Sequence, residues 1–202
     1  MADYNRGIKL PGEILNQQEI RCLLAACNRG PSGARNRALL VVLWRAGLRT
    51  AEALALRASD LDSASGLVRV RRGKAGKPRW VGMDTEAFTT VEAWLARREG
   101  LGLNGHAHLF CTLQGRPLDA GYCRAMIKQL ARRADLRKRA HLHGLRHSHA
   151  VELAKRDVPR VVALKVVDRG LVGYEDVAVL AAGQAGVVHT DVDGLEAVTA
   201  LP

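Results

Sequence analysis

The chain has 202 residues, of which 48% are hydrophobic and 25% charged, which fits one folded domain and excludes a disordered chain or a multi-domain assembly. Its 31 Lys and Arg exceed its 20 Asp and Glu by 11, so a polyanion such as nucleic acid is the expected partner. Within residues 1–159 the longest apolar run, 38–44, is too short for a membrane span, and no secretion signal precedes it, so we expect a cytoplasmic protein without membrane contact.

Helical patterns dominate the chain. Asn16 and Glu19 have the spacing of a capping box, and the apolar residues after them recur at helical intervals. Gly and Pro in residues 30–33 interrupt this pattern, and Thr50 is the expected cap of a later helix. The patterns predict helices over 17–28, 34–45, 51–57, 85–98, 119–133 and 143–156.

One segment has the pattern of strands. Residues 67–71 alternate apolar with basic side chains, and an extended pattern resumes at 79–81 after a Gly- and Lys-rich connection. This predicts a β-hairpin with a strongly basic tip. The expected fold class is therefore α+β and mainly α, with one small antiparallel β-sheet.

Residues 160–202 differ from the rest of the chain. They carry three Lys or Arg against six Asp or Glu. Eleven of the residues in this segment are Val, and several Gly interrupt any helical periodicity. The positive charge is therefore concentrated in residues 1–159.

The cysteines and histidines do not form a metal motif. The four cysteines lack a Cys-x-x-Cys pair, and the neighbours of the paired histidines are Arg and Gly rather than further ligands. We expect reduced thiols and neither a metal nor a disulfide framework.

Two segments carry groups suited to phosphate chemistry. In the first, Arg49 follows a Gly turn at a predicted helix start, where backbone N–H groups also favour an anion, and Glu52 lies one turn on and could hold the guanidinium. In the second, His143 and Arg146 lie one helical turn apart, which brings an imidazole and a guanidinium fork to one ligand. The alternatives are a surface ion pair for the first segment and a basic patch on the DNA backbone for the second.

The Gly-Leu-Arg-x-x-Glu-x-Leu-x-Leu segment at 47–56 and the His-x-Leu-Arg-His segment at 143–147 resemble the two signature boxes of the tyrosine recombinases, the phage and integron integrase family. The basic hairpin between them also matches, and the resemblance covers about residues 8–159. It implies a linker over 1–15, the helical catalytic domain over 16–159, and a divergent tail over 160–202. The abrupt change there suggests a reading-frame shift near codon 160.

The resemblance implies a function and roles for named residues. Members of the family cut double-stranded DNA by attack of a tyrosine on a phosphodiester, without metal or cofactor, and act as homo-oligomers on DNA. By motif position, Arg49 and Arg146 bind the non-bridging oxygens, Glu52 supports Arg49, and His143 is the general base or hydrogen-bond donor.

The remaining roles fall on the hairpin and the tail. Lys74 is the expected acid for the leaving 5′ oxygen, with Lys77 as the alternative, and His147 supports the site or contacts the DNA backbone. Tyr174 is the one tyrosine of the tail and hence the candidate nucleophile, although the two carboxylates that follow it would raise its pKa and repel a phosphate. Three functions stay open: an active recombinase, an inactive DNA-binding remnant, and a strand nicker resembling type IB topoisomerases.

Overall fold

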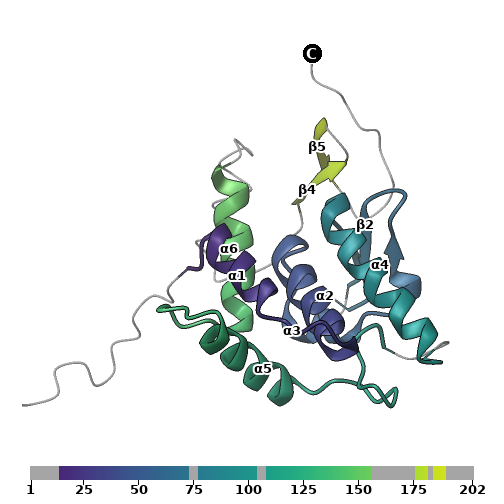
Figure 1. Ribbon diagram of the computed structural model, residues 1–202. Coiled ribbons are helices and arrows are strands. Elements are labelled where there is room, and N and C mark those ends of the chain that lie inside the picture. Colours follow the sequence, from purple (N-terminus) through teal and green to yellow (C-terminus); the bar gives the residue numbers. More distant parts are fainter. Residues whose placement is uncertain (1–13, 73–76, 104–107, 156–175, 182–183, 190–202) are drawn as a thin grey trace, which may run out of the picture.

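The computed structural model describes residues 14–72, 77–103, 108–155, 176–181 and 184–189 (Figure 1). These residues form a mainly helical body with a small antiparallel sheet, so the expected fold class is confirmed. The helices are α1 (Gln17–Ala25), α2 (Pro31–Arg45), α3 (Thr50–Ala55), α4 (Thr85–Gly100), α5 (Ala120–Arg133) and α6 (Leu142–Lys155). The strands are β1 (Leu61–Asp62), β2 (Leu67–Val70), β3 (Arg79–Gly82), β4 (Asp176–Ala181) and β5 (Gln184–His189), and a 3-10 turn spans Ala58–Asp60.

The helix starts follow from their capping residues. The Asn16 side chain accepts a hydrogen bond from the Glu19 amide, and the Glu19 carboxylate accepts one from the Asn16 amide, so the predicted capping box is confirmed. The predicted start of the second helix at 34 is wrong, because Pro31 takes the first helical position, where no N–H is needed. The predicted cap of the third helix is also wrong. Arg49 is the capping residue there, and Thr50 is the first helical residue.

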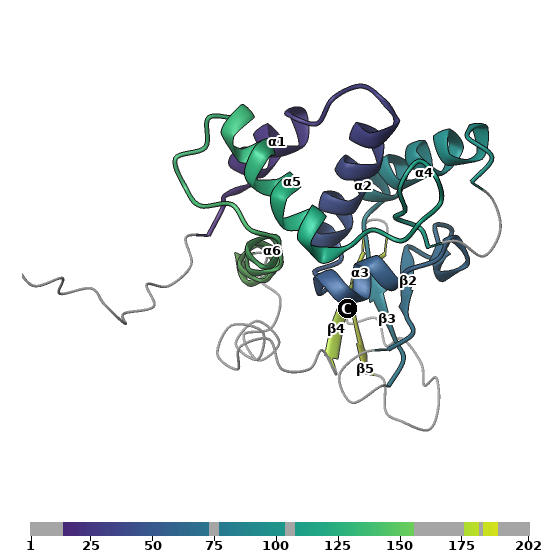
Figure 2. The ribbon, with the colours of Figure 1, turned by 90° about the horizontal axis from the view of Figure 1, so that it is seen from below.

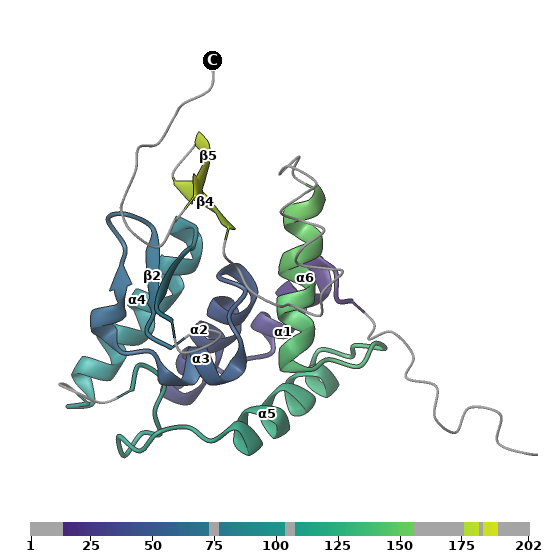
Figure 3. The ribbon, with the colours of Figure 1, turned by 180° about the vertical axis from the view of Figure 1, so that it is seen from behind.

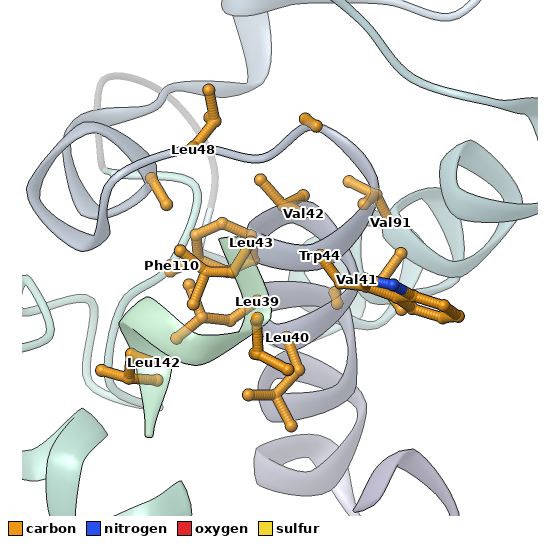
Figure 4. Close-up of a cluster of buried hydrophobic side chains, with 14 of the residues drawn as sticks. Leu39, Leu40, Val41, Val42, Leu43, Trp44, Leu48, Val91, Phe110 and Leu142 are labelled. Carbon is orange, nitrogen blue, oxygen red and sulfur yellow. The ribbon is translucent and has the colours of Figure 1, made fainter. Parts of the chain in front are cut away.

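Helix α2 lies at the centre of the body (Figure 4). Every residue from Ala38 to Trp44 is buried, which is the pattern of a helix surrounded by other elements. It packs against α4 on one side and α6 on another, with α1 and α3 also in contact. Figure 4 shows its leucines beside Phe110 and Leu142.

The strands form two antiparallel sheets. The first sheet has the strand order β1–β2–β3. Between β2 and β3, Val68 pairs with Val81, Val70 with Arg79, and Arg69 with Trp80. The first two pairs face the body, whereas Arg69 and Trp80 are exposed, so the predicted hairpin is confirmed. The sequence analysis did not predict the second sheet, in which β4 pairs with β5, with β4 beside β3. Within the described residues, none of the helices has the length and apolar character to cross a bilayer.

Shortening a core side chain of α2 tests this packing. Leu40→Ala should lower the free energy of unfolding by about 2–5 kcal/mol, because the side chain is fully buried and its loss leaves a cavity. The same change at Leu101, which is 42% exposed, should cost less than about 1 kcal/mol. Urea unfolding of both variants makes the comparison, and equal losses would contradict a core centred on α2.

Candidate functional site

The turn between α2 and α3 is held by α6. Arg146 of α6 is fully buried, and its Nη1 donates a hydrogen bond to the Gly47 carbonyl oxygen. Gly47 has a φ of +57°, and a Cβ atom there would lie 2.4 Å from Cδ2 of His149. A residue with a side chain would therefore be strained and would collide with α6. This close approach joins the two segments that the sequence analysis singled out.

A buried carboxylate organises the start of α3. Oε1 of Glu52 accepts from Nη1 of Arg49 at 2.9 Å, and its Oε2 accepts from the Arg49 amide at 2.9 Å. Arg79 of β3 donates to both oxygens, at 3.1 and 2.9 Å. The Glu52 side chain is only 6% exposed, whereas that of Arg49 is 33% exposed. One carboxylate therefore holds two guanidinium groups, one of which reaches the surface.

Electrostatics keep this carboxylate ionised. Burial by itself disfavours the charged form of Glu52, but the hydrogen bonds from Arg79 and Arg49 outweigh it and hold the pKa below its ordinary value. With two guanidinium groups and one carboxylate, the cluster carries a net positive charge at neutral pH, which favours an anionic ligand beside Arg49.

Helix α6 presents two further titratable groups. The rings of His143 and His147 meet edge to face with centroids 4.5 Å apart. Burial lowers the pKa of His143 most, and the positive charges of His147, Arg146, His141 and Arg49 lower it further. Burial and Arg146 likewise lower the pKa of His147. Both shifts favour the neutral imidazole, and the charges of both Arg49 and Arg146 act on His143.

Polar contacts fix the position of α6. Trp44 of α2 donates from Nε1 to Oε1 of Glu152 at 2.8 Å, and Arg45 bridges Glu152 to Asp84, the capping residue of α4. Ser148 donates to the Leu15 carbonyl oxygen at 2.7 Å. These contacts connect α6 to α2, to α4 and to the residues before α1, and so orient its histidines and Arg146.

The views agree that α3 lies between α6 and the β2–β3 hairpin (Figures 2 and 3). The structure thus brings five of the predicted site residues to one region, namely Arg49, Glu52, His143, Arg146 and His147. Lys77 is described and exposed, whereas Lys74 and Tyr174 lie outside the described residues.

Sequence reasoning missed Arg79. Its signal was an arginine at an inward-facing position of a strand, opposite the buried Val70, where an apolar residue is the rule. An inward charge requires a buried partner, but the identity of that partner depends on tertiary structure.

Tyr122 is the only tyrosine in the part of the chain that the structure describes, and it lies elsewhere. Its hydroxyl accepts a hydrogen bond from Arg35, the fifth residue of α2. Arg35 precedes Arg45, the last residue of α2, by ten residues, or about 15 Å at the standard helical rise, and Gly47 lies beyond that end of the helix. Tyr122 therefore cannot act at the Arg49–Arg146 region.

The arrangement is suited to binding a phosphate group. Guanidinium groups bind phosphate oxygens in fixed directions, and a neutral imidazole can accept or donate a proton beside them. Among the described residues, no three His, Cys, Asp or Glu side chains gather as a metal site would require.

Comparison with known proteins agrees with this chemistry. Residues 13–177 match the sequence model of the phage integrase family, a range that includes Tyr174. The tyrosine recombinase XerC of Xanthomonas campestris pv. campestris (strain B100) is 39% identical over 142 residues, which are 70% of this chain and 42% of that protein. The tyrosine recombinase XerD of Halalkalibacterium halodurans is 35% identical over 148 residues, 72% of this chain and 49% of that protein. The chain thus spans less than half the length of these relatives.

Solved structures show the same fold. The crystal structure of XerA recombinase matches with a TM-score of 0.66 and 25% identity, over 78% of this chain and 55% of that one. XerH recombinase bound to a palindromic difH substrate, in a post-cleavage complex, matches with a TM-score of 0.65 and 27% identity, over 79% and 47%. The lambda integrase catalytic core shares the fold, with a TM-score of 0.57 and 17% identity, over 76% of this chain and 93% of that one.

The convergence of the two segments can be tested by NMR titration of the histidines. Arg49→Met should raise the pKa of His143, because it removes a positive charge that disfavours protonation, and should leave that of His147 nearly unchanged. Arg124→Met, which removes an exposed charge on α5, is the control and should shift neither pKa. An unaltered pKa of His143 in the Arg49→Met variant would show that the two segments do not meet.

Proposed function

The chain belongs to the phage integrase family, and from this premise we propose that residues 16–159 are the catalytic domain of a site-specific DNA recombinase. The observation that carries the proposal is the grouping of Arg49, His143 and Arg146 around the α2–α3 turn. Residues 1–15 would then serve as a linker and residues 160–202 as a divergent tail. A DNA substrate also fits the cytoplasmic location expected from the sequence.

In this proposal the site binds one phosphodiester of DNA. Arg49 and Arg146 bind the two non-bridging oxygens and stabilise the additional negative charge of the pentacovalent transition state. Glu52 keeps Arg49 in place. The lowered pKa of His143 leaves its imidazole neutral, so it can accept a proton from the nucleophile or donate a hydrogen bond to the phosphate.

The reaction needs a nucleophile and an acid. We assign the nucleophile to Tyr174, whose hydroxyl oxygen would form a bond to phosphorus while the bond from phosphorus to the 5′ oxygen breaks. Lys74 at the hairpin tip, or Lys77 as the alternative, would protonate the departing oxygen. His147 would support the phosphate or the neighbouring DNA backbone. The reverse reaction with another 5′ hydroxyl reseals the strand, and no cofactor takes part.

The proposed partner is double-stranded DNA, bound by a homo-oligomer. The net charge of +11 supports this partner, as do two of the matched structures, in which XerH recombinase is bound to its difH substrate. Since each neutralised phosphate releases counterions, binding should weaken steeply as salt is raised.

A second function, a DNA-binding remnant that cannot cleave, is favoured by one observation. Tyr174 is followed in sequence by Glu175 and Asp176. Carboxylates beside a phenol raise its pKa and repel the phosphate, both of which oppose attack. The remnant would keep the phosphate site and lose only the covalent step.

A nicked suicide DNA duplex distinguishes the two functions. If Tyr174 is the nucleophile, the full chain should form an adduct that survives denaturation, and Tyr174→Phe should abolish it while retaining DNA binding. Tyr122→Phe is the matched control and should leave the adduct unchanged, because its hydroxyl binds Arg35 far from the site. DNA binding without an adduct would establish the remnant, and the absence of salt-sensitive binding would contradict both functions.

A further inference from the structure

We propose that Arg79 is a positioning residue that sets the direction and effective charge of Arg49 through Glu52. The inference rests on the proposed function, since it gives Arg79 a part in phosphate binding without contact to the phosphate. It also connects the hairpin to the helix that carries Arg49.

The contacts of Arg79 point to one partner. Nη1 and Nη2 bind the two oxygens of Glu52 as a fork, at 3.1 and 2.9 Å. The third nitrogen of Arg79, Nε, is buried and has no hydrogen-bond partner among the described residues. The Arg79 side chain is 15% exposed, and its guanidinium binds Glu52. A fork of this kind fixes the carboxylate plane as well as its distance.

Glu52 transmits this constraint to Arg49. Each carboxylate oxygen receives one bond from Arg79 and one from Arg49, the latter from the Arg49 side chain on Oε1 and from its backbone on Oε2. Rotation of the carboxylate would break all four bonds. The plane imposed by Arg79 therefore determines where Nη1 of Arg49 can bind, and hence where the remainder of that guanidinium points.

Arg79 also changes the electrostatic balance. If Glu52 had Arg49 as its only partner, the pair would be neutral and the carboxylate would repel an approaching phosphate. Because Arg79 shares the same carboxylate, the cluster keeps one net positive charge beside the exposed part of Arg49. A second cation on the same buried carboxylate therefore favours an anionic ligand such as phosphate beside Arg49.

The position of Arg79 in β3 couples two parts of the site. The register places it opposite Val70 on the inward face, in the last pair before the connection that contains Lys74 and Lys77. The Glu52 fork thus ties the connection end of this hairpin to the start of α3. Arg69, on the outward face of the same hairpin, stacks on Trp80 and has no such connection.

A double-mutant cycle in DNA binding tests the inference. Arg49→Met and Arg79→Met should each weaken binding of a labelled duplex about tenfold, and the double variant should bind within about twofold of Arg49→Met alone. Arg49→Met should reduce the slope of the logarithm of the binding constant against the logarithm of the salt concentration by about one phosphate contact. Arg79→Met should not reduce this slope further when Arg49 is absent. Fluorescence anisotropy over a salt series gives both quantities.

Two variants guard against misinterpretation. Arg124→Met removes an exposed charge on α5 and should weaken binding less than about threefold. Arg79→Lys retains the charge but cannot form the fork, so it should weaken DNA binding only when Arg49 is present. If circular dichroism shows that Arg79→Met is unfolded, Arg79→Lys takes its place in the cycle.

The outcomes separate the inference from the proposed function. If the losses of DNA-binding affinity in the two single variants add in the double variant, with a further decrease in salt dependence, Arg79 contacts DNA directly. If Arg79→Met binds DNA like the wild type, Arg79 has no role in binding. Either result overturns the inference and leaves the proposed function standing. Failure of the wild-type chain to bind DNA, or full binding by Arg49→Met, would instead overturn the proposed function.

Discussion

The site depends on the hydrogen bond from the buried Arg146 guanidinium to the Gly47 carbonyl oxygen. This bond joins α6 to the turn before α3, across 99 positions of sequence. The turn accepts α6 at this distance because Gly47 has a positive φ and no side chain where His149 packs. Arg146 therefore has a structural role as well as the proposed role at the phosphate, and a substitution there would disturb both.

Charge sharing is the second constraint on the site. Glu52 holds Arg49 and Arg79 together, and its lowered pKa keeps it ionised although it is buried. The same positive surroundings lower the pKa of His143, so the imidazole stays neutral beside guanidinium groups that cannot lose their protons. A neutral imidazole among fixed cations is suited to a phosphate substrate, because the cations bind the phosphate oxygens while the imidazole accepts or donates a proton.

The sequence predicts much of this arrangement from local patterns. The Asn16 capping box and the alternating β2–β3 hairpin depend on neighbouring residues, and both were predicted correctly. The start of α2 at Pro31 and the Arg49 cap were missed, because a helix end depends on which backbone groups the tertiary structure satisfies. Arg79 was missed for a similar reason: its partner lies 27 positions away.

The proposed site requires Arg49 and Arg146 to act on the same phosphate. A crystal structure of the full chain bound to a DNA duplex, at a resolution that places phosphate oxygens, tests it most directly. Both guanidinium groups should contact non-bridging oxygens of one phosphate, with His143 within hydrogen-bond distance of it. Arginines bound to different phosphates, or Arg146 held away from the DNA, would contradict it.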